Sequence, residues 1–170
     1  NKLPELFDCI LVDAPCSGEG MFRKDEGAIA EWSMKNVQEC AERQCDILDD
    51  VWDALKPGGI LIYSTCTFNR EENEKNAQWI ADELGAEVLP INHNTEWGIT
   101  EGKPGYHFYP HKTKGEGFYI CAFRKSGVPA GTFRIPKQKN PVSETVEFKD
   151  IMQSWLLHPD QWTIRQQDRF

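Results

Sequence analysis

Residues 55–68 read LKPGGILIYSTCTF, and residues 7–18 read FDCILVDAPCSG. In both stretches a short apolar run is followed closely by a cysteine, Cys66 in the first and Cys16 in the second. Continuous apolar runs of this length predict buried parallel strands, here at 7–12 and 60–63. Residues that follow such strands gather at one edge of an open α/β sheet. If the two strands are neighbours, we expect the two thiols to converge.

The segment between the two runs predicts a helix. Apolar residues at positions 37, 41, 48, 52 and 55 have the spacing of one helical face. The stretch 56–59, Lys-Pro-Gly-Gly, is typical of a helix end and the turn beyond it. Two neighbouring strands that are joined by a crossover helix run parallel, and such a crossover is almost always right-handed. The sequence therefore predicts that the strands before Cys16 and Cys66 are parallel.

The rest of the chain predicts a second helix, two more strands and a tail. Asn69, followed by acidic residues, predicts a helix cap, and the helix should end near Leu84 and Gly85. Residues 86–89 and 117–123 indicate strands, and 92–117 a long functional loop. We expect one domain over 1–125, a linker over 126–141, and the start of a truncated appended module over 142–170.

Composition excludes several classes of protein. The chain has 170 residues and a net charge of −8, without an apolar run near the ~20 residues that span a bilayer. Its six cysteines show no Cys-x-x-Cys pair and no zinc-type spacing, so we expect no metal and reduced thiols in the cytoplasm. For Cys9, Cys40, Cys45 and Cys121 we expect core packing. Because a strand follows Asn1 so closely, we also expect the chain to be a piece of a longer protein.

Charge is unevenly distributed along the chain. Residues 103–139 contain eight Lys or Arg residues and one acid, a net charge of +7, whereas the remainder contains 11 basic and 26 acidic residues, a net charge of −15. This asymmetry favours a face that meets a polyanion. We therefore expect the basic residues of 103–139 to share a face with the two thiols.

Three motifs together carry a resemblance to a known family. They are LKPGG at 55–59, DAPCSG at 13–18 and STCT at 64–67. Over about residues 5–125 the chain resembles the Sun (Nop/Sun, Fmu) family of RNA cytosine-5 methyltransferases, and its tail is similar to bacterial members that act on small-subunit ribosomal RNA. The resemblance implies an α/β fold, the second half of a Rossmann-like class I methyltransferase sheet, mostly parallel with an antiparallel last strand. It also implies RNA as substrate and S-adenosyl-L-methionine as cofactor.

The resemblance assigns roles to the residues of two motifs. Cytosine carbon 5 is a poor nucleophile, so a thiolate must first add to carbon 6. The resemblance implies that Cys66 is this nucleophile and that Cys16 assists product release. It places Asp13 and Pro15 at the cofactor, and Asp13, Ser17 and Gly18 at the substrate. The family's glycine-rich cofactor loop would precede Asn1, so we expect the isolated chain to be inactive.

Two further interpretations remain open. The chain can be a non-catalytic RNA-binding or ribosome-assembly domain of the same fold, although both motif cysteines are intact. It can also be a thiol redox protein that uses Cys16 and Cys66 as a reversible pair. The aromatic and histidine residues at 107–111 resemble a late family motif near the substrate, but ordinary loop aromatics explain them equally well.

Overall fold

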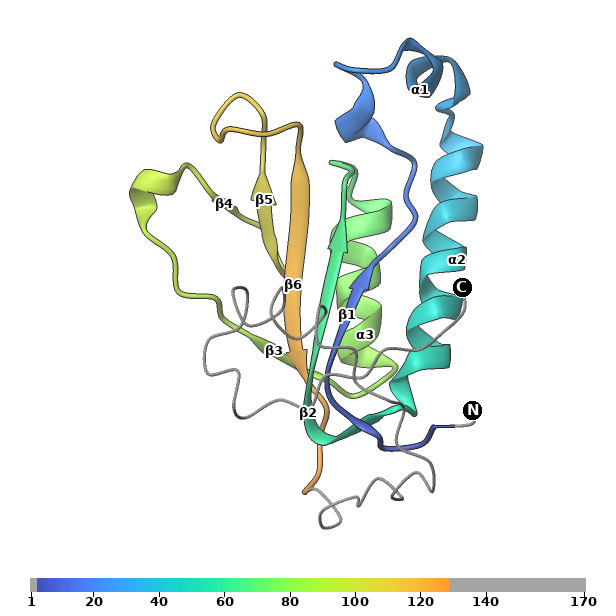
Figure 1. Ribbon diagram of the computed structural model, residues 1–170, viewed down its shortest axis with the longest axis vertical. Coiled ribbons are helices and arrows are strands. Elements are labelled where there is room, and N and C mark those ends of the chain that lie inside the picture. The colour runs from blue at the N-terminus through green and yellow to red at the C-terminus, as the bar shows by residue number, and fades with distance from the viewer. Residues whose placement is uncertain (1–2, 129–170) are drawn as a thin grey trace, which may run out of the picture. The chain divides into compact units, whose positions relative to one another are not determined.

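The computed structural model describes residues 3–128 of the chain, in which β1 (Phe7–Asp13) and β2 (Leu55–Thr65) lie side by side (Figure 1). The two strands are parallel, with Val12 opposite Tyr63 and Asp13 opposite Ser64. The helix α2 (Met34–Trp52) connects them. The predicted strand–helix–strand unit is therefore confirmed, and the carboxyl ends of both strands lie at the same end of the sheet.

Antiparallel strands complete the sheet on the far side of β2. The strand β6 (Phe118–Arg124) pairs with β2, and the sheet continues through β5 (Tyr106–Phe108) to β4 (Thr100–Glu101). The strand β3 (Glu87–Leu89) pairs with the other end of β6. The predicted α/β class, with a parallel β1–β2 pair and an antiparallel last strand, is confirmed. Residues 92–117 are not only loop, since they contain β4, β5 and the 3-10 turn η3 (Thr95–Trp97).

The helix α2 ends earlier than its apolar pattern predicts. It ends at Trp52, and Leu55 is instead the first residue of β2, fully buried opposite Phe7. Cys9 already pairs with Ile60, so residues 56–59 form a bulge within β2. Pro57 disfavours helical backbone at the residue before it and offers no N–H to a helix. Leu55 fits the helical spacing by position alone, and it is apolar because the first residue of β2 is buried in the core.

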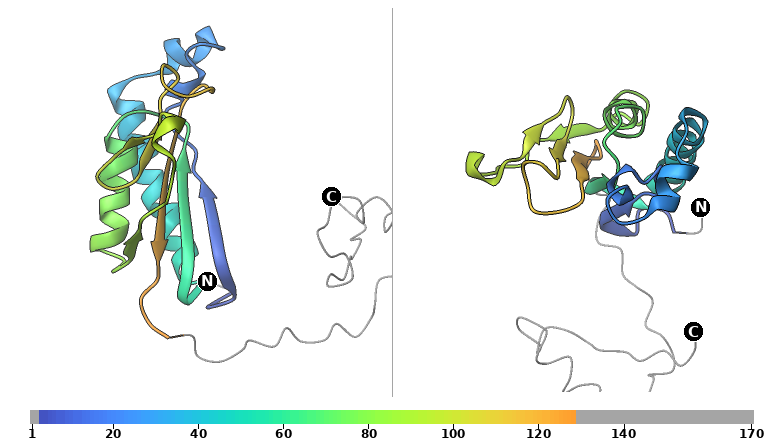
Figure 2. Two further views of the ribbon diagram at one scale, coloured as in Figure 1. Left: turned by 90° about the vertical axis from the view of Figure 1, so that its left-hand side faces the viewer. Right: turned by 90° about the horizontal axis from the view of Figure 1, so that it is seen from above.

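The second predicted helix is present in two parts, the π-helical turn η2 (Glu71–Lys75) and α3 (Asn76–Asp82). The side-chain oxygen of Asn69 accepts a hydrogen bond from the Glu72 N–H at 2.9 Å, which confirms the predicted cap. Both α2 and α3 lie on the same face of the sheet (Figure 2). Leu48, Trp52 and Ile80 of these helices pack on Leu61 and Phe123 of the strands.

The prediction that β1 is a buried strand is right for one of its faces and wrong for the other. Val12 faces the helices and is buried, whereas Leu11 is 64% exposed and Phe7 41% exposed. Within residues 3–128, β1 is the edge strand, and its second face has no helix of the described part against it. Core packing is accordingly wrong for Cys9, which is exposed, and right for Cys121, which is buried. Cys40 and Cys45 are half-buried.

Two short elements lie between β1 and α2. The 3-10 turn η1 (Glu19–Met21) follows the DAPCSG motif, and the short helix α1 (Glu26–Glu31) leads into α2. None of the helices described in residues 3–128 is both long and apolar enough to cross a membrane. The predicted linker lies almost wholly, and the predicted appended module wholly, outside the described residues.

Candidate active site

The two motif thiols meet at the carboxyl ends of β1 and β2. The sulfur atoms of Cys16 and Cys66 are 2.7 Å apart. Cys66 is exposed and Cys16 is half-buried, and both are free cysteines. The prediction that these thiols converge at the ends of adjacent parallel strands is confirmed. The two thiols are therefore in direct contact, and the exposed Cys66 can reach an external molecule.

The close pairing makes the two thiols chemically unequal. A hydrogen bond from Cys16 lowers the pKa of Cys66 from 9.0 to about 7, against the opposing effects of partial burial and of the Asp13 and Glu72 charges. The pKa of Cys16 is raised, because its thiol is held by Cys66 and is partly buried. Since the thiolate is the nucleophilic form of cysteine, the thiol with the lowered pKa is the more reactive of the two.

Asp13 and Pro15 lie exposed at the same sheet edge. Asp13 is the last residue of β1, and one of its carboxylate oxygens accepts a hydrogen bond from the Ser64 hydroxyl at 2.8 Å. The carbonyl of Pro15 accepts a hydrogen bond from the Gln44 side chain of α2, also at 2.8 Å. The helix thus supports the loop directly before Cys16, while Asp13 presents its carboxylate to the outside.

Ser17 and Gly18 give the loop after Cys16 its course. Ser17 is buried, and its N–H and hydroxyl both donate to the Glu72 carboxylate. Gly18 has a φ of 76°, a left-handed conformation that glycine adopts without steric cost. Gly20 N–H then donates to the Cys66 carbonyl at 2.8 Å, and a Cβ at Gly20 would lie 2.6 Å from that same oxygen. Glycine at position 20 therefore permits the close approach of the two cysteine loops.

Two carboxylates join these loops. Glu19, from the loop of Cys16, accepts hydrogen bonds from the backbone N–H groups of Phe68 and Asn69 at 2.7 and 2.9 Å. Glu72, which follows the loop of Cys66, accepts from the Ser17 N–H at 2.9 Å and from the Ser17 hydroxyl. Neither residue stands out in the sequence as part of a site. The spacing of Asn69 and Glu72 indicates a helix start, and it carries no sign of a contact with another loop.

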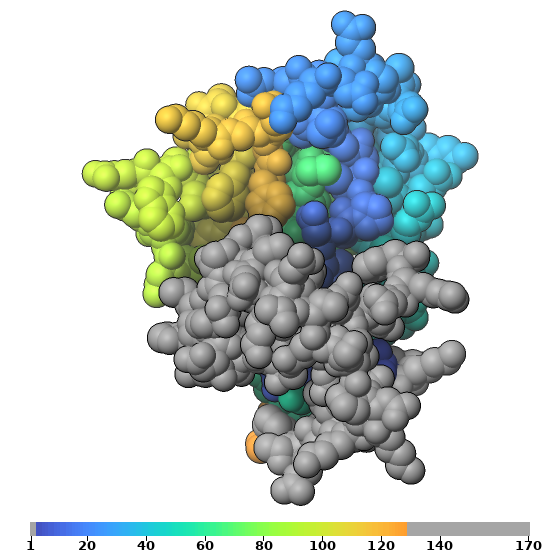
Figure 3. Space-filling model, in the orientation of Figure 1, coloured from blue at the N-terminus to red at the C-terminus, as the bar shows by residue number. Residues whose placement is uncertain are grey.

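The loop before β6 lies against the loop that follows Cys16. Gly20 lies near the Glu116 and Gly117 carbonyls, so the loops after β1 and before β6 meet above the ends of the strands (Figure 1). In the space-filling view, β6, β2 and β1 lie side by side below these loops (Figure 3). Arg23 and Lys24 each lie 3.6 Å from the Glu116 carboxylate. They place positive charge beside the Cys16 loop.

The predicted placement of the basic residues is wrong for Arg124 and Lys125. Because β6 is antiparallel to β2, Arg124 pairs with Ile60, whereas Tyr119 pairs with Thr65 next to the thiols. Five residues of strand separate the two ends by about 17 Å. Lys125 donates to the carbonyls of Trp52 and Leu55, so it lies where α2 ends and β2 begins. Arg134, Lys137 and Lys139 lie outside the described residues.

His107 occupies a buried site on β5. Its imidazole Nε2 is 2.8 Å from the Glu74 carboxylate, and its ring stacks on Tyr109 with a centroid distance of 4.9 Å. Tyr109 in turn contacts Phe68, two residues after Cys66. Burial raises and His107 lowers the pKa of Glu74, and the net effect is a pKa below the ordinary 4.5. The contact between His107 and Glu74 connects the β4–β5 hairpin to η2.

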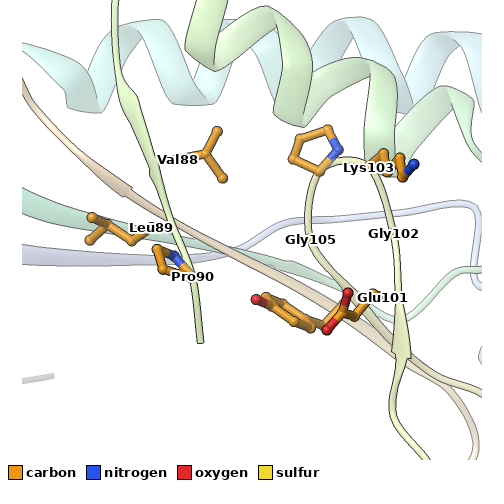
Figure 4. A pocket seen from close by; sticks show the side chains of 9 residues that line it. Val88, Leu89, Pro90, Glu101, Gly102, Lys103 and Gly105 are labelled. Carbon is orange, nitrogen blue, oxygen red and sulfur yellow. The ribbon is translucent and has the colours of Figure 1, made fainter. Parts of the chain in front are cut away.

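A pocket of about 300 Å³ lies beside the same hairpin, between β3 and the β4–β5 turn (Figure 4). Val88, Leu89 and Pro90 line one side, and residues 101–106 line the other. None of the lining residues belongs to the two cysteine loops. The pocket is therefore separate from the thiol site.

Comparison with known proteins shows which family the chain resembles. Residues 1–124 match the family model described as 16S rRNA methyltransferase RsmB/F. The chain is 44% identical over 144 residues to ribosomal RNA small subunit methyltransferase F of Escherichia fergusonii, which covers 81% of this chain and 29% of that protein. The protein of the same name from Aliivibrio fischeri is 35% identical over 182 residues, covering 98% of this chain and 38% of that protein. The chain thus spans well under half the length of these relatives.

Solved structures show the same fold. A methyltransferase homolog protein from Pyrococcus horikoshii is 34% identical, with a TM-score of 0.58, and the match covers 73% of this chain and 40% of that one. NSun6 from Pyrococcus horikoshii, solved with SFG, is 30% identical with a TM-score of 0.58, covering 70% of this chain and 30% of that one.

Proposed function

Because the chain belongs to the 16S rRNA methyltransferase RsmB/F family, we propose that it carries the covalent-chemistry half of an enzyme that methylates carbon 5 of cytosine in small-subunit ribosomal RNA. The observation that carries this proposal is the Cys16–Cys66 pair, with 2.7 Å between the sulfur atoms and a pKa of about 7 for Cys66. About half of Cys66 is then thiolate near neutral pH. This proposal includes a cytoplasmic location.

The first step is addition of the Cys66 sulfur to carbon 6 of the cytosine. A carbon–sulfur bond forms, and the electron pair of the 5,6 double bond moves toward carbon 5. Asp13, exposed at the end of β1, accepts a hydrogen bond from the base along its nitrogen edge. Ser17 and Gly18 shape the loop against which the nucleotide lies. Carbon 5 thereby becomes a nucleophile that can take a methyl group.

The cofactor of this proposal is S-adenosyl-L-methionine, which supplies an electrophilic methyl group on a sulfonium sulfur when bound. The analogue SFG accompanies the related NSun6 structure. The residues of this chain fit one side of such a cofactor, since Asp13 and Pro15 are exposed at the carboxyl edge of the sheet, where ligands of open α/β sheets bind. Asp13 also keeps one carboxylate oxygen tied to Ser64, which fixes its orientation.

The last step releases the methylated base. Carbon 5 of the cytosine loses its proton to a proton acceptor, and the 5,6 double bond forms again. The carbon–sulfur bond then breaks, and its electron pair returns to the Cys66 sulfur. Cys16 keeps its proton because its pKa is raised, so it can donate a hydrogen bond to the sulfur that leaves. One thiol therefore attacks and the other helps it to leave.

The test uses the chain within a protein of full family length. Cys16→Ala should accumulate a denaturant-resistant adduct on RNA, because addition becomes slower without the Cys16 hydrogen bond but remains possible, whereas release is impaired. Cys66→Ala should give no adduct and no methylation. Both are measured by gel migration after incubation with RNA and S-adenosyl-L-methionine. An adduct with Cys66→Ala and none with Cys16→Ala would reverse the roles, and methylation that survives Cys66→Ala would refute covalent catalysis.

A further inference from the structure

The spacing of the two thiols is set from outside the cysteine motifs. Neither sulfur is part of a regular element: Cys66 follows the last residue of β2, and Cys16 lies three residues beyond β1. A loop of this kind does not by itself hold two side chains at 2.7 Å. Side chains that bind both loops must therefore fix the distance.

Glu72 holds the loop of Cys16 from the side of Cys66. Its side chain is fully buried, and its carboxylate accepts hydrogen bonds from Ser17 N–H and from the amides of Gln44 at 2.8 Å and Asn69 at 2.7 Å. Gln44 also donates to the Pro15 carbonyl. The residues on both sides of Cys16 are thus anchored, one directly to Glu72 and the other through Gln44.

Glu19 makes the reverse connection. It belongs to the loop of Cys16, and its carboxylate accepts from the N–H groups of Phe68 and Asn69, directly after Cys66 and Thr67. The Trp32 indole N–H donates to its other oxygen at 3.1 Å. Each cysteine loop therefore contributes or adjoins one carboxylate that binds the backbone of the other loop.

Neutral hydrogen-bond donors, and not a cation, compensate the buried carboxylate of Glu72. None of the ion pairs found among residues 3–128 involves Glu72, and its partners there are an amide N–H, a hydroxyl and two carboxamides. A buried carboxylate is costly unless such donors compensate it. A glutamate at this position is accordingly a strong geometric constraint, because each donor must stay in place.

We propose that Glu72 and Glu19 are positioning residues that set the distance between Cys16 and Cys66, and thereby keep Cys66 ready to attack. This inference deepens the proposed function and rests on it. The two residues act through the loops and touch neither substrate nor reacting atoms. Glu72 has the larger effect, since it also anchors Pro15 through Gln44.

The proposal predicts the direction in which the pKa of Cys66 moves. The groups that act on this thiol are Cys16, whose hydrogen bond lowers its pKa most, and the charges of Asp13 and Glu72, which raise it. If Glu72→Gln only removed a charge, the pKa of Cys66 would fall. If Glu72 positions the thiols, the same substitution separates them, the hydrogen bond is lost, and the pKa rises toward 9.0.

The experiment measures the pH dependence of Cys66 alkylation by iodoacetamide in the 170-residue chain, resolved by site with tandem mass spectrometry. For Glu72→Gln we expect the midpoint to rise by about one pH unit or more, and alkylation at pH 7 to slow about fivefold. Glu71→Gln is the matched control, since it removes the same charge one residue earlier, where Glu71 pairs with Lys75. Its midpoint should equal that of the unmodified chain.

Two further variants test whether Glu72 acts on Cys66 through its position or through its charge. In a Cys16→Ala background, where no thiol hydrogen bond exists, Glu72→Gln should no longer raise the midpoint. If Glu72→Gln does not fold, as judged by circular dichroism, Glu19→Gln decides, and it should raise the midpoint by a smaller amount. A folded variant whose midpoint falls or stays unchanged overturns the positioning role. Because no RNA or cofactor is used, this result is independent of the methylation test.

Discussion

Glu72 and Glu74 lie two residues apart in η2, and the structure satisfies their carboxylates differently. Glu72 turns toward the thiol loops and is bound by neutral donors, whereas Glu74 turns toward the β4–β5 hairpin and is bound by the imidazole of His107. Glu72 accepts from four donors on three residues that belong to or adjoin the two cysteine loops, whereas Glu74 contacts the hairpin through the His107 imidazole. Substitution of Glu72 should therefore disturb more contacts than substitution of Glu74.

The largest expected effect is on Glu72. Glu72→Ala leaves the donors of Ser17, Gln44 and Asn69 buried without their acceptor and also creates a cavity. We expect a loss of about 3 kcal/mol in the free energy of unfolding. Urea denaturation followed by near-ultraviolet circular dichroism measures this loss. A loss below about 1 kcal/mol would show that water replaces the carboxylate at little cost.

An intermediate effect is expected for Glu74, and it should depend on pH. Its pKa is below 4.5 in the folded chain, so its contribution is fully present above 4.5 and is lost as the pH falls through the folded value. Glu74→Gln should cost about 1 kcal/mol at pH 7, and this difference should shrink toward zero near pH 3. Urea denaturation at both pH values is the measurement. A difference that grows in acid would contradict the assignment of the stabilised carboxylate.

The smallest effect is expected for Glu71, in the same turn. Its carboxylate pairs with Lys75 at 2.6 Å on an exposed surface, where ion pairs contribute little. Glu71→Gln should change the free energy of unfolding by less than about 0.5 kcal/mol at pH 7. A larger loss in the same denaturation experiment would mean that the charge of the turn, and not the specific partners, distinguishes these three glutamates.

The sequence predicts the thiol pair but not the residues that hold it. Two apolar runs, each followed closely by a cysteine, suffice to place Cys16 and Cys66 at one edge, because parallel neighbouring strands end together. Glu72 has no such signal, since an acid three residues after Asn69 is typical of an exposed first turn. Its burial depends on Ser17, 55 residues away. Long-range contacts of this kind follow from the fold and not from a local pattern.

The fold itself is predictable where one physical rule dominates. The strand–helix–strand unit follows from apolar periodicity and from the handedness of crossovers. The end of α2 and the β4–β5 hairpin do not, because Leu55 fits both a helix and a strand and because two- and three-residue strands carry little periodicity. His107 was equally ambiguous in sequence. Its burial against Tyr109 and Tyr119 requires the hairpin to be present first.

The one-sided cover of β1 has a practical consequence for the chain as prepared in solution. Among residues 3–128, β1 pairs only with β2, so its other edge offers unpaired backbone N–H and C=O groups next to the exposed Phe7 and Leu11. An uncovered apolar edge of this kind is a template for edge-to-edge self-association. If this edge stays as residues 3–128 leave it, we expect concentrated samples to self-associate through β1, and Leu11→Lys to reduce this association without disturbing the thiols.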